Sequence, residues 1–227
     1  MTISWPRGRA RTVTAWTLLA AVGSGVAMLA AAMAVYPGGT ALEPGAVGHS
    51  FWRNFLCDLT QNVAVNGSPN HPGAGLACGA LAAFGVAVGC FWWLLPAVLE
   101  GRCNSRWALA IRVLGAVSLL GLVAVPVVNG PAHMVAVFAS SVPGLAAAVL
   151  AMVACARAGV WPLVVLAVAT VGAATIDSVL YAHSYMIHPR VVGPALPAFQ
   201  RLALMALLVW MVATAVRAGV SAGGRRS

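Results

Sequence analysis

Six stretches of apolar residues are spaced along the chain, separated by clusters of Gly, Pro, Asn or Arg that interrupt helices. A transmembrane helix needs about 20 mostly apolar residues, so each stretch predicts one membrane-spanning helix. The predicted helices cover residues 13–36, 73–98, 107–128, 132–155, 160–182 and 198–217. The pattern therefore predicts an all-α, polytopic membrane helical bundle with a long first loop at 37–72.

Composition agrees with this pattern. Of the 227 residues, 61% are hydrophobic and 7% are charged, whereas about a quarter of the residues of a soluble protein are charged. Six helices and their loops use up the chain, so we expect one integral membrane domain over 1–227. The first apolar stretch follows three Arg residues and contains Ala-Met-Ala at 32–34, as a cleaved signal peptide would. It is longer than a signal core of about 7–15 residues, so we expect a retained helix.

The basic residues predict the orientation in the membrane. All thirteen are Arg, and they lie at the ends of the apolar stretches rather than on one polar face, so we expect no nucleic-acid partner. Cytoplasmic loops carry the excess of positive charge. Placing both termini in the cytoplasm puts ten Arg inside and leaves Arg53, Arg190 and Arg201 outside.

The same orientation gathers most other ionisable groups on the outer side. Glu100 is the one acid expected in the cytoplasm. The outer groups are three acids and all five His, namely Glu43, Asp58, Asp177, His49, His71, His133, His183 and His188. A binding or catalytic site is therefore expected on the outer side.

The first loop contains a four-residue repeat of polar side chains. Ser50, Asn54, Asp58, Asn62 and Asn66 recur at this spacing beside an apolar stripe, which predicts an amphipathic helix over 50–65. Two interpretations stay open. The helix is a lid that only packs on the bundle, or its amide and carboxylate face, with Asn54, Asp58 and Asn62, lines a pocket.

His133 follows the turn Asn129-Gly130-Pro131, so its imidazole is expected in the first turn of the fourth helix. The helix dipole disfavours a protonated ring at this position. A neutral ring can bind a metal or accept a proton. It can equally form a structural hydrogen bond with a loop carbonyl.

Asp177 lies near the outer end of the fifth predicted helix, where a carboxylate must be paired or face a cavity. Tyr181 and Tyr185 follow at four-residue spacing, on the same helix face. The last helix carries Gln200 and Arg201 in its first turn. Asp177 is expected either to pair with Arg201 or Tyr181 or to line an outer pocket together with Asp58 and His133.

A metal centre is an alternative on the same side. His183 and His188 are five residues apart, which does not place two ligands on one helix face. A site would need the loop to bend, and its ligands would come from His133, His183, His188, Asp58 and Asp177. We expect no cofactor, with zinc or another divalent metal as the alternative.

Several segments resemble an uncharacterised family of bacterial six-helix membrane proteins. They are Phe55-Leu56-Cys57-Asp58-Leu59, Asn66-Gly67 with Asn70, His133, and Leu196-Pro197-Ala198-Phe199-Gln200 with Trp210. The chain is more remotely similar to the DRAM/Sfk/FRAG membrane proteins, which tend to have Ser where this chain has Cys57. The resemblance implies six helices in a bacterial plasma membrane and no established activity.

Taken together, these patterns predict a plasma-membrane protein whose outer polar pocket binds a lipid or small amphiphile. The candidate ligand-binding residues are Asn54, Asp58, Asn62, His133, Asp177, Tyr181 and Gln200. One alternative is a metal-assisted hydrolase or transferase acting on lipid, with His133 as a metal ligand and Asp58 or Asp177 as ligand or base. A second alternative is a small transporter.

Overall fold

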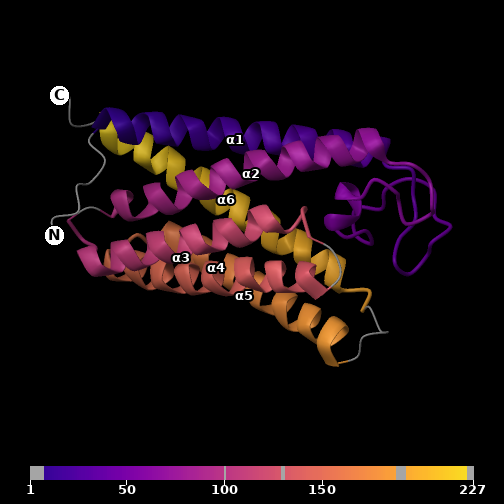
Figure 1. The fold of residues 1–227 in the computed structure, drawn as a ribbon. Helices are drawn as coiled ribbons and strands as arrows, with labels where there is room; N and C mark the ends of the chain where they lie inside the picture. The colour runs from indigo at the N-terminus through magenta and orange to yellow at the C-terminus, as the bar shows by residue number, and fades with distance from the viewer. Residues whose placement is uncertain (1–7, 100, 129–130, 188–192, 224–227) are drawn as a thin grey trace.

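The computed structural model describes residues 8–99, 101–128, 131–187 and 193–223. Within these ranges the chain forms a bundle of long antiparallel helices without a β-strand (Figure 1). The long helices are α1 (Gly8–Val35), α2 (His71–Val98), α3 (Ser105–Ala124), α4 (Pro131–Arg157), α5 (Trp161–Ala182) and α6 (Leu196–Gly223). All six are long and apolar enough to cross a membrane, which confirms the predicted all-α membrane bundle.

The bounds differ most from the prediction at the two ends of the chain. Helix α1 begins at Gly8 rather than at residue 13. Its first turns therefore include Arg9 and Arg11, and the Arg11 side chain is buried. A long Arg side chain can pack its methylene stem against apolar neighbours, so a charge near a helix end does not stop the helix. Helix α6 similarly runs to Gly223, beyond the predicted residue 217.

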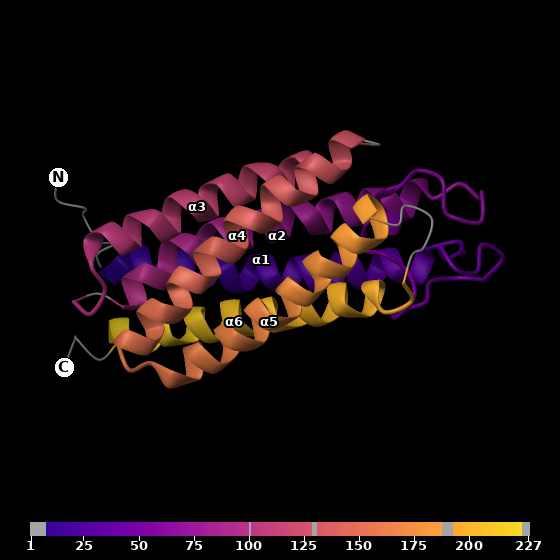
Figure 2. The same cartoon turned by 90° about the horizontal axis from the view of Figure 1, so that it is seen from below.

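Neighbouring helices in sequence also pack together in space. The most extensive contacts join α1 to α2, α3 to α4 and α5 to α6. Helix α6 also contacts α1 and α2, so the chain closes on itself (Figures 1 and 2). This closure brings the start of α6 beside the segment that joins α1 to α2.

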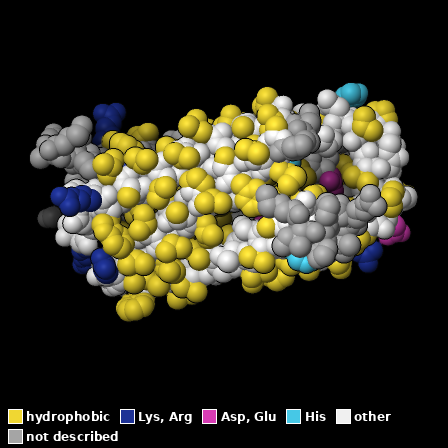
Figure 3. Space-filling model, turned by 60° about the horizontal axis from the view of Figure 1, so that its bottom comes forward, with side chains coloured by type: hydrophobic (Ala, Val, Ile, Leu, Met, Phe, Trp, Pro, Cys, Tyr) yellow, Lys and Arg dark blue, Asp and Glu magenta, His cyan; other side chains and the backbone are white. Residues whose placement is uncertain are grey.

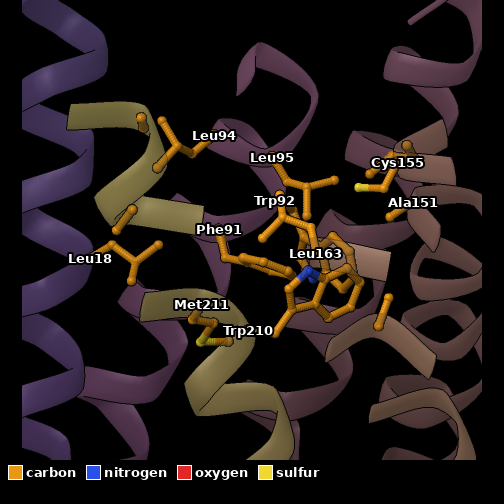
Figure 4. Packing of buried hydrophobic residues seen from close by; sticks show 14 of the residues in the cluster. Leu18, Phe91, Trp92, Leu94, Leu95, Ala151, Cys155, Leu163, Trp210 and Met211 are labelled. Atoms are coloured by element: carbon orange, nitrogen blue, oxygen red, sulfur yellow. The ribbon is translucent and has the colours of Figure 1, made fainter. Parts of the chain in front are cut away.

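The main hydrophobic core lies between α2, α6 and their neighbours. Phe91 packs on Trp92 and Trp210, with ring centroids 4.7 and 5.0 Å apart. Figure 4 shows these three rings together, with Leu163 of α5 close by. Aromatic side chains bury a large contact area, and tilted or edge-to-face ring pairs such as these stabilise the packed helices.

The α3–α4 crossing depends on small residues. A Cβ added to Gly121 would collide with the backbone at Ala139 and Ser140, and one added to Gly144 would meet Ser118 Oγ at 2.7 Å. Helices in membranes approach closely where small residues meet, because van der Waals packing drives their association. Gly121 therefore sets how near α3 lies to α4.

The segment from 37 to 70 does not form the predicted amphipathic helix over 50–65. Its one helical turn is η1, a 3-10 helix at Cys57–Thr60, and the rest consists of turns and extended backbone. The polar side chains explain the difference. Asn54 Oδ1 accepts from Ser50 N at 2.9 Å and Asp58 Oδ2 accepts from Phe55 N at 2.8 Å, so these side chains compete with helical hydrogen bonds for the backbone.

This segment, which we call loop 37–70, is nevertheless ordered by its own contacts. Leu59 and Ala64 pack with Tyr36 and with residues of α1 and α2 in a second small core. The buried Asn70 donates through Nδ2 to the carbonyls of Leu59 and Gln61, at 3.2 and 2.9 Å. Loop 37–70 is therefore a fixed structure on the end of the bundle.

Charge is distributed unequally between the two ends of the bundle. On the face drawn in Figure 3, basic side chains gather at one end, while acidic and His side chains lie at the other, where some basic surface is also visible. The first end holds the starts of α1 and α3 and the ends of α4 and α6, with Arg9, Arg106, Arg157 and Arg217. We call it the arginine end, and the end that carries loop 37–70 the loop end.

Candidate functional site

Polar side chains from loop 37–70 and the start of α6 meet at the loop end. We call this group the loop cluster. Its members are His49, Asn54, Asp58, Gln200 and Arg201. Two of them, Asn54 and Arg201, are almost completely buried.

Asn54 is the centre of the hydrogen bonds in the loop. Its Nδ2 donates to the Gly39 carbonyl at 2.7 Å and to Asp58 Oδ2 at 3.0 Å. Its Oδ1 accepts from the Ser50 amide. One side chain thus joins three parts of the loop and orients the Asp58 carboxylate.

The Asp58 carboxylate has partly given up its hydration. Burial raises its pKa, whereas the hydrogen bonds from Asn54 and from the Phe55 amide and the charge of Arg201 oppose this rise. Loss of hydration destabilises the charged form of a carboxyl, and donors stabilise it. Asp58 is therefore a carboxyl that can take up a proton more readily than a solvated aspartic acid.

Gln200 joins the loop to α6. Its Oε1 accepts from the Leu56 amide at 2.8 Å and from Arg201 Nη1 at 3.4 Å. The first of these bonds links residues far apart in the sequence, so it requires the closed helix arrangement. Gln200 therefore holds the segment next to Asp58 against the start of α6.

Arg201 is the largest charged group in the cluster and is 1% exposed. Nη1 also donates to the Pro197 carbonyl at 3.4 Å, Nη2 lies 3.4 Å from His49 Nε2, and Nε has no hydrogen-bond partner in the structure. The guanidinium lies over the Phe51 ring, 5.5 Å from its centroid. These contacts are long for a charged donor, whose hydrogen bonds to oxyanions are typically about 2.7–2.9 Å.

His49 is held as a neutral ring. Burial and the neighbouring Arg201 charge lower its pKa from 6.5 to about 4. An arginine can only donate hydrogen bonds, so the Nε2 atom of His49 acts as the acceptor. The Tyr36 ring meets the imidazole edge-on, with centroids 5.9 Å apart.

Two tyrosines extend the polar surroundings towards α5. Helix α5 continues into η2, a π-helix at His183–Ile187, which carries Tyr185. The rings of Tyr181 and Tyr185 are 4.6 Å apart. Tyr185 lies within electrostatic range of Cys57 and Asp58, and Tyr181 within range of Cys57 and Asp177. The tyrosine pair therefore lies between the loop cluster and Asp177.

Asp177 forms neither of the two pairs that were one alternative for it, as far as the described residues show. It is half-buried on α5, and among the described residues it makes no ion pair with Arg201 and no hydrogen bond with Tyr181. Asp177 lies near Tyr181, and its role as a ligand-binding residue stays a prediction.

His133 forms a structural hydrogen bond with a loop carbonyl, which was one of the two roles expected for it. Its Nδ1 lies 3.0 Å from the Val125 carbonyl at the end of α3. A carbonyl oxygen can only accept, so Nδ1 carries the proton and donates. This bond joins the start of α4 to the end of α3.

The remaining predicted residues are placed as follows. Asn62 is exposed, and its carbonyl, rather than its side chain, accepts from Asn70 N at 2.7 Å. His183 is exposed at the end of α5. His188 lies outside the described residues.

The metal alternative finds no ligand set in the described part of the chain. No three side chains among its His, Cys, Asp and Glu residues gather in an arrangement that could hold a metal ion. Three or more such ligands are the usual requirement for a zinc site. One of the proposed ligands, His188, lies outside the described residues, so the metal site stays a prediction.

Cys57 lies beside Asp58 and does not serve as a ready nucleophile. Burial and the charge of Asp58 raise the pKa of its thiol to about 12. The thiolate is the reactive form of cysteine. The arrangement of the cluster is thus suited to hydrogen bonding and charge recognition rather than to attack by this thiol.

The pattern of residues did not single out Arg201 or His49 as members of the site. Arg201 carried a signal, because a charge in the opening turns of an apolar helix is costly unless it has a partner. The sequence around His49 gave no such signal, since the position of His49 depends on how loop 37–70 folds.

Three comparisons, with protein-family models, with curated proteins and with solved structures, found no match to this chain.

Proposed function

We propose that this chain is a bacterial plasma-membrane protein, with both termini in the cytoplasm, whose loop cluster binds the polar head of a lipid or small amphiphile. The charge asymmetry supports the orientation, because the arginine end matches the positive charge of cytoplasmic loops. The loop end then faces away from the cytoplasm.

The observation that carries the proposal is the burial of polar groups beneath loop 37–70. Asn54 and Arg201 are 0% and 1% exposed, although their helices and loop lie at the end of an apolar bundle. Polar groups buried in this way are costly unless they are paired or bind a ligand. Arg201 makes only long hydrogen bonds, so a polar head group would complete its surroundings.

Aromatic residues beside the cluster favour an amphiphile. Phe51 and Trp52 are exposed on loop 37–70, and their rings meet edge-on at 4.8 Å. Tryptophan and other aromatic rings are favoured where membrane meets water. Such a surface would contact the first carbons of an acyl chain while the cluster holds the head group.

The test is native mass spectrometry of the full chain, purified in a neutral maltoside detergent and incubated with a bacterial lipid extract. We expect the wild type to retain one lipid. The double variant Asp58→Asn with Gln200→Ala should lose it, because the hydrogen bonds that fold the loop around Asp58 are altered and the tie between Leu56 and Gln200 is gone, so loop 37–70 no longer lies against Arg201.

The matched control is Gln61→Ala, which removes an exposed glutamine from the same loop. It should retain lipid like the wild type. A wild type that retains no lipid, or a double variant that retains as much as the wild type, would contradict the proposal.

A further inference from the structure

The positive charge of Arg201 has no carboxylate in contact within the described residues. At the loop end, Glu43 pairs with the exposed Arg53 at 3.4 Å. Asp58 uses Oδ2 to accept from Asn54 and from the Phe55 amide. It influences Arg201 by its charge without forming an ion pair with it. A buried charge without a paired partner strongly destabilises a protein.

One edge of the Arg201 guanidinium, formed by Nε and Nη2, has hydrogens left to donate. Nη1 is occupied by the Pro197 carbonyl and Gln200, whereas Nε is buried and has no hydrogen-bond partner in the part of the chain that the structure describes. Nη2 carries two hydrogens, so it can contact His49 and still direct one hydrogen to the side of Nε. The Nε and Nη2 donors together form the planar fork that binds two oxygens of a carboxylate or phosphate.

We infer that the loop cluster binds an oxyanion, a phosphate or carboxylate group, on the Nε–Nη2 edge of Arg201. This inference rests on the proposed function, because it names the head group of the amphiphile. The neighbours fit this ligand. His49 is uncharged, Phe51 covers the guanidinium, and the Gln200 amide oxygen is already turned towards Leu56 N and Arg201.

Such an oxyanion can come from an amphiphile or from solution, so the probes separate these two sources. They are dodecyl phosphate, 1-O-dodecylglycerol as the uncharged amphiphile of equal chain length, and inorganic phosphate. Affinities are measured by isothermal titration calorimetry on the full chain in neutral maltoside micelles, with empty micelles subtracted.

We expect the wild type to bind dodecyl phosphate about tenfold or more tightly than 1-O-dodecylglycerol, the scale of losing charge-assisted hydrogen bonds. Arg201→Gln should abolish this preference. Arg201→Lys keeps the charge and loses the fork, so it should retain only part of it. Arg53→Gln removes an exposed charge from the same end and should leave the preference unchanged.

Two wild-type outcomes separate this inference from the proposed function without any variant. Equal binding of both amphiphiles would overturn the oxyanion and leave amphiphile binding in place. Binding of inorganic phosphate alone would support the oxyanion and overturn amphiphile binding, whereas binding of no probe would overturn both.

If Arg201→Gln does not fold, the comparison of the wild type with Arg201→Lys and Arg53→Gln tests the role of the Arg201 fork. A Lys variant equal to the wild type would overturn the fork.

Discussion

Asn54 illustrates how much a single side chain contributes at the loop end. It is completely buried and hydrogen-bonded to Gly39, Ser50 and Asp58, so it joins three parts of the loop. Removing one partner of a buried hydrogen bond leaves the other without a substitute from water. The carboxylate of Asp58 would also lose the donor that orients it.

We therefore expect Asn54→Ala to lower the free energy of unfolding by about 1–3 kcal/mol. The control is Asn62→Ala, which truncates an exposed asparagine of the same loop and should change stability little. Thermal unfolding in maltoside micelles provides the measurement. Equal melting temperatures for the two variants would contradict the central role of Asn54.

His49 predicts a loss of stability on acidification. Its pKa is lowered from 6.5 to about 4 in the folded chain, so between these pH values the unfolded chain takes up a proton that the folded chain does not. The stabilising contribution is complete above pH 6.5 and is lost as the pH falls through about 4. Asp58 acts in the opposite direction, since its raised pKa favours the folded chain at lower pH.

The comparison between variants isolates the histidine. His49→Gln should show a smaller decrease of melting temperature between pH 6.5 and 4 than the wild type. His71→Gln, at an exposed position of α2, should follow the wild type. A His49→Gln series parallel to that of the wild type would exclude the assigned role of His49.

At the level of elements, close helix crossings depend on where glycine meets backbone. Gly121 of α3 touches the backbone of α4 at Ala139 and Ser140, whereas no neighbour lies near the Cβ position of Gly23 on α1. The two positions look alike in the sequence, because both are glycines within apolar stretches. Only the packing of the partner helix distinguishes them.

Gly121→Ala should destabilise the bundle by about 1–3 kcal/mol, because the backbone of α4 must move to make room. Gly23→Ala should be neutral or stabilising, since alanine favours a helix by about 1 kcal/mol over glycine. Unfolding in mixed micelles of dodecyl sulfate and maltoside measures both. A tolerated Gly121→Ala would show that the crossing is looser than the structure places it.

At the scale of the whole molecule, the proposed orientation rests on the separation of charge between the two ends. Val47 on loop 37–70 is 96% exposed, and Ser105 is exposed at the start of α3 on the arginine end. A cysteine at either position is accessible to a reagent on its own side of the membrane. The two positions therefore report the two sides.

We expect Val47→Cys, in a chain whose five native cysteines are replaced by Ala, to react with a membrane-impermeant maleimide in intact spheroplasts. Ser105→Cys should react only after the membrane is permeabilised. The parent chain without cysteines is the control for labelling. The reverse pattern would contradict cytoplasmic termini.

The fold class was predictable because it depends on local properties of the sequence. Inside a membrane, a helix satisfies all the backbone hydrogen bonds of its own segment, so an apolar stretch of sufficient length predicts a helix. The six predicted stretches coincide with α1 to α6, apart from a few residues at their ends. The start of α4 at Pro131 was also predictable, since the missing amide of proline is tolerated in the first turn.

The site depended on tertiary structure. The four-residue repeat of polar residues predicted a helix over 50–65, but the side chains of Asn54 and Asp58 bind the backbone of the loop instead. The meeting of Gln200 with Leu56, and of Arg201 with His49, requires α6 to lie against loop 37–70. Helical periodicity describes neighbours along one element, whereas contacts between distant segments are decided by how all the helices pack.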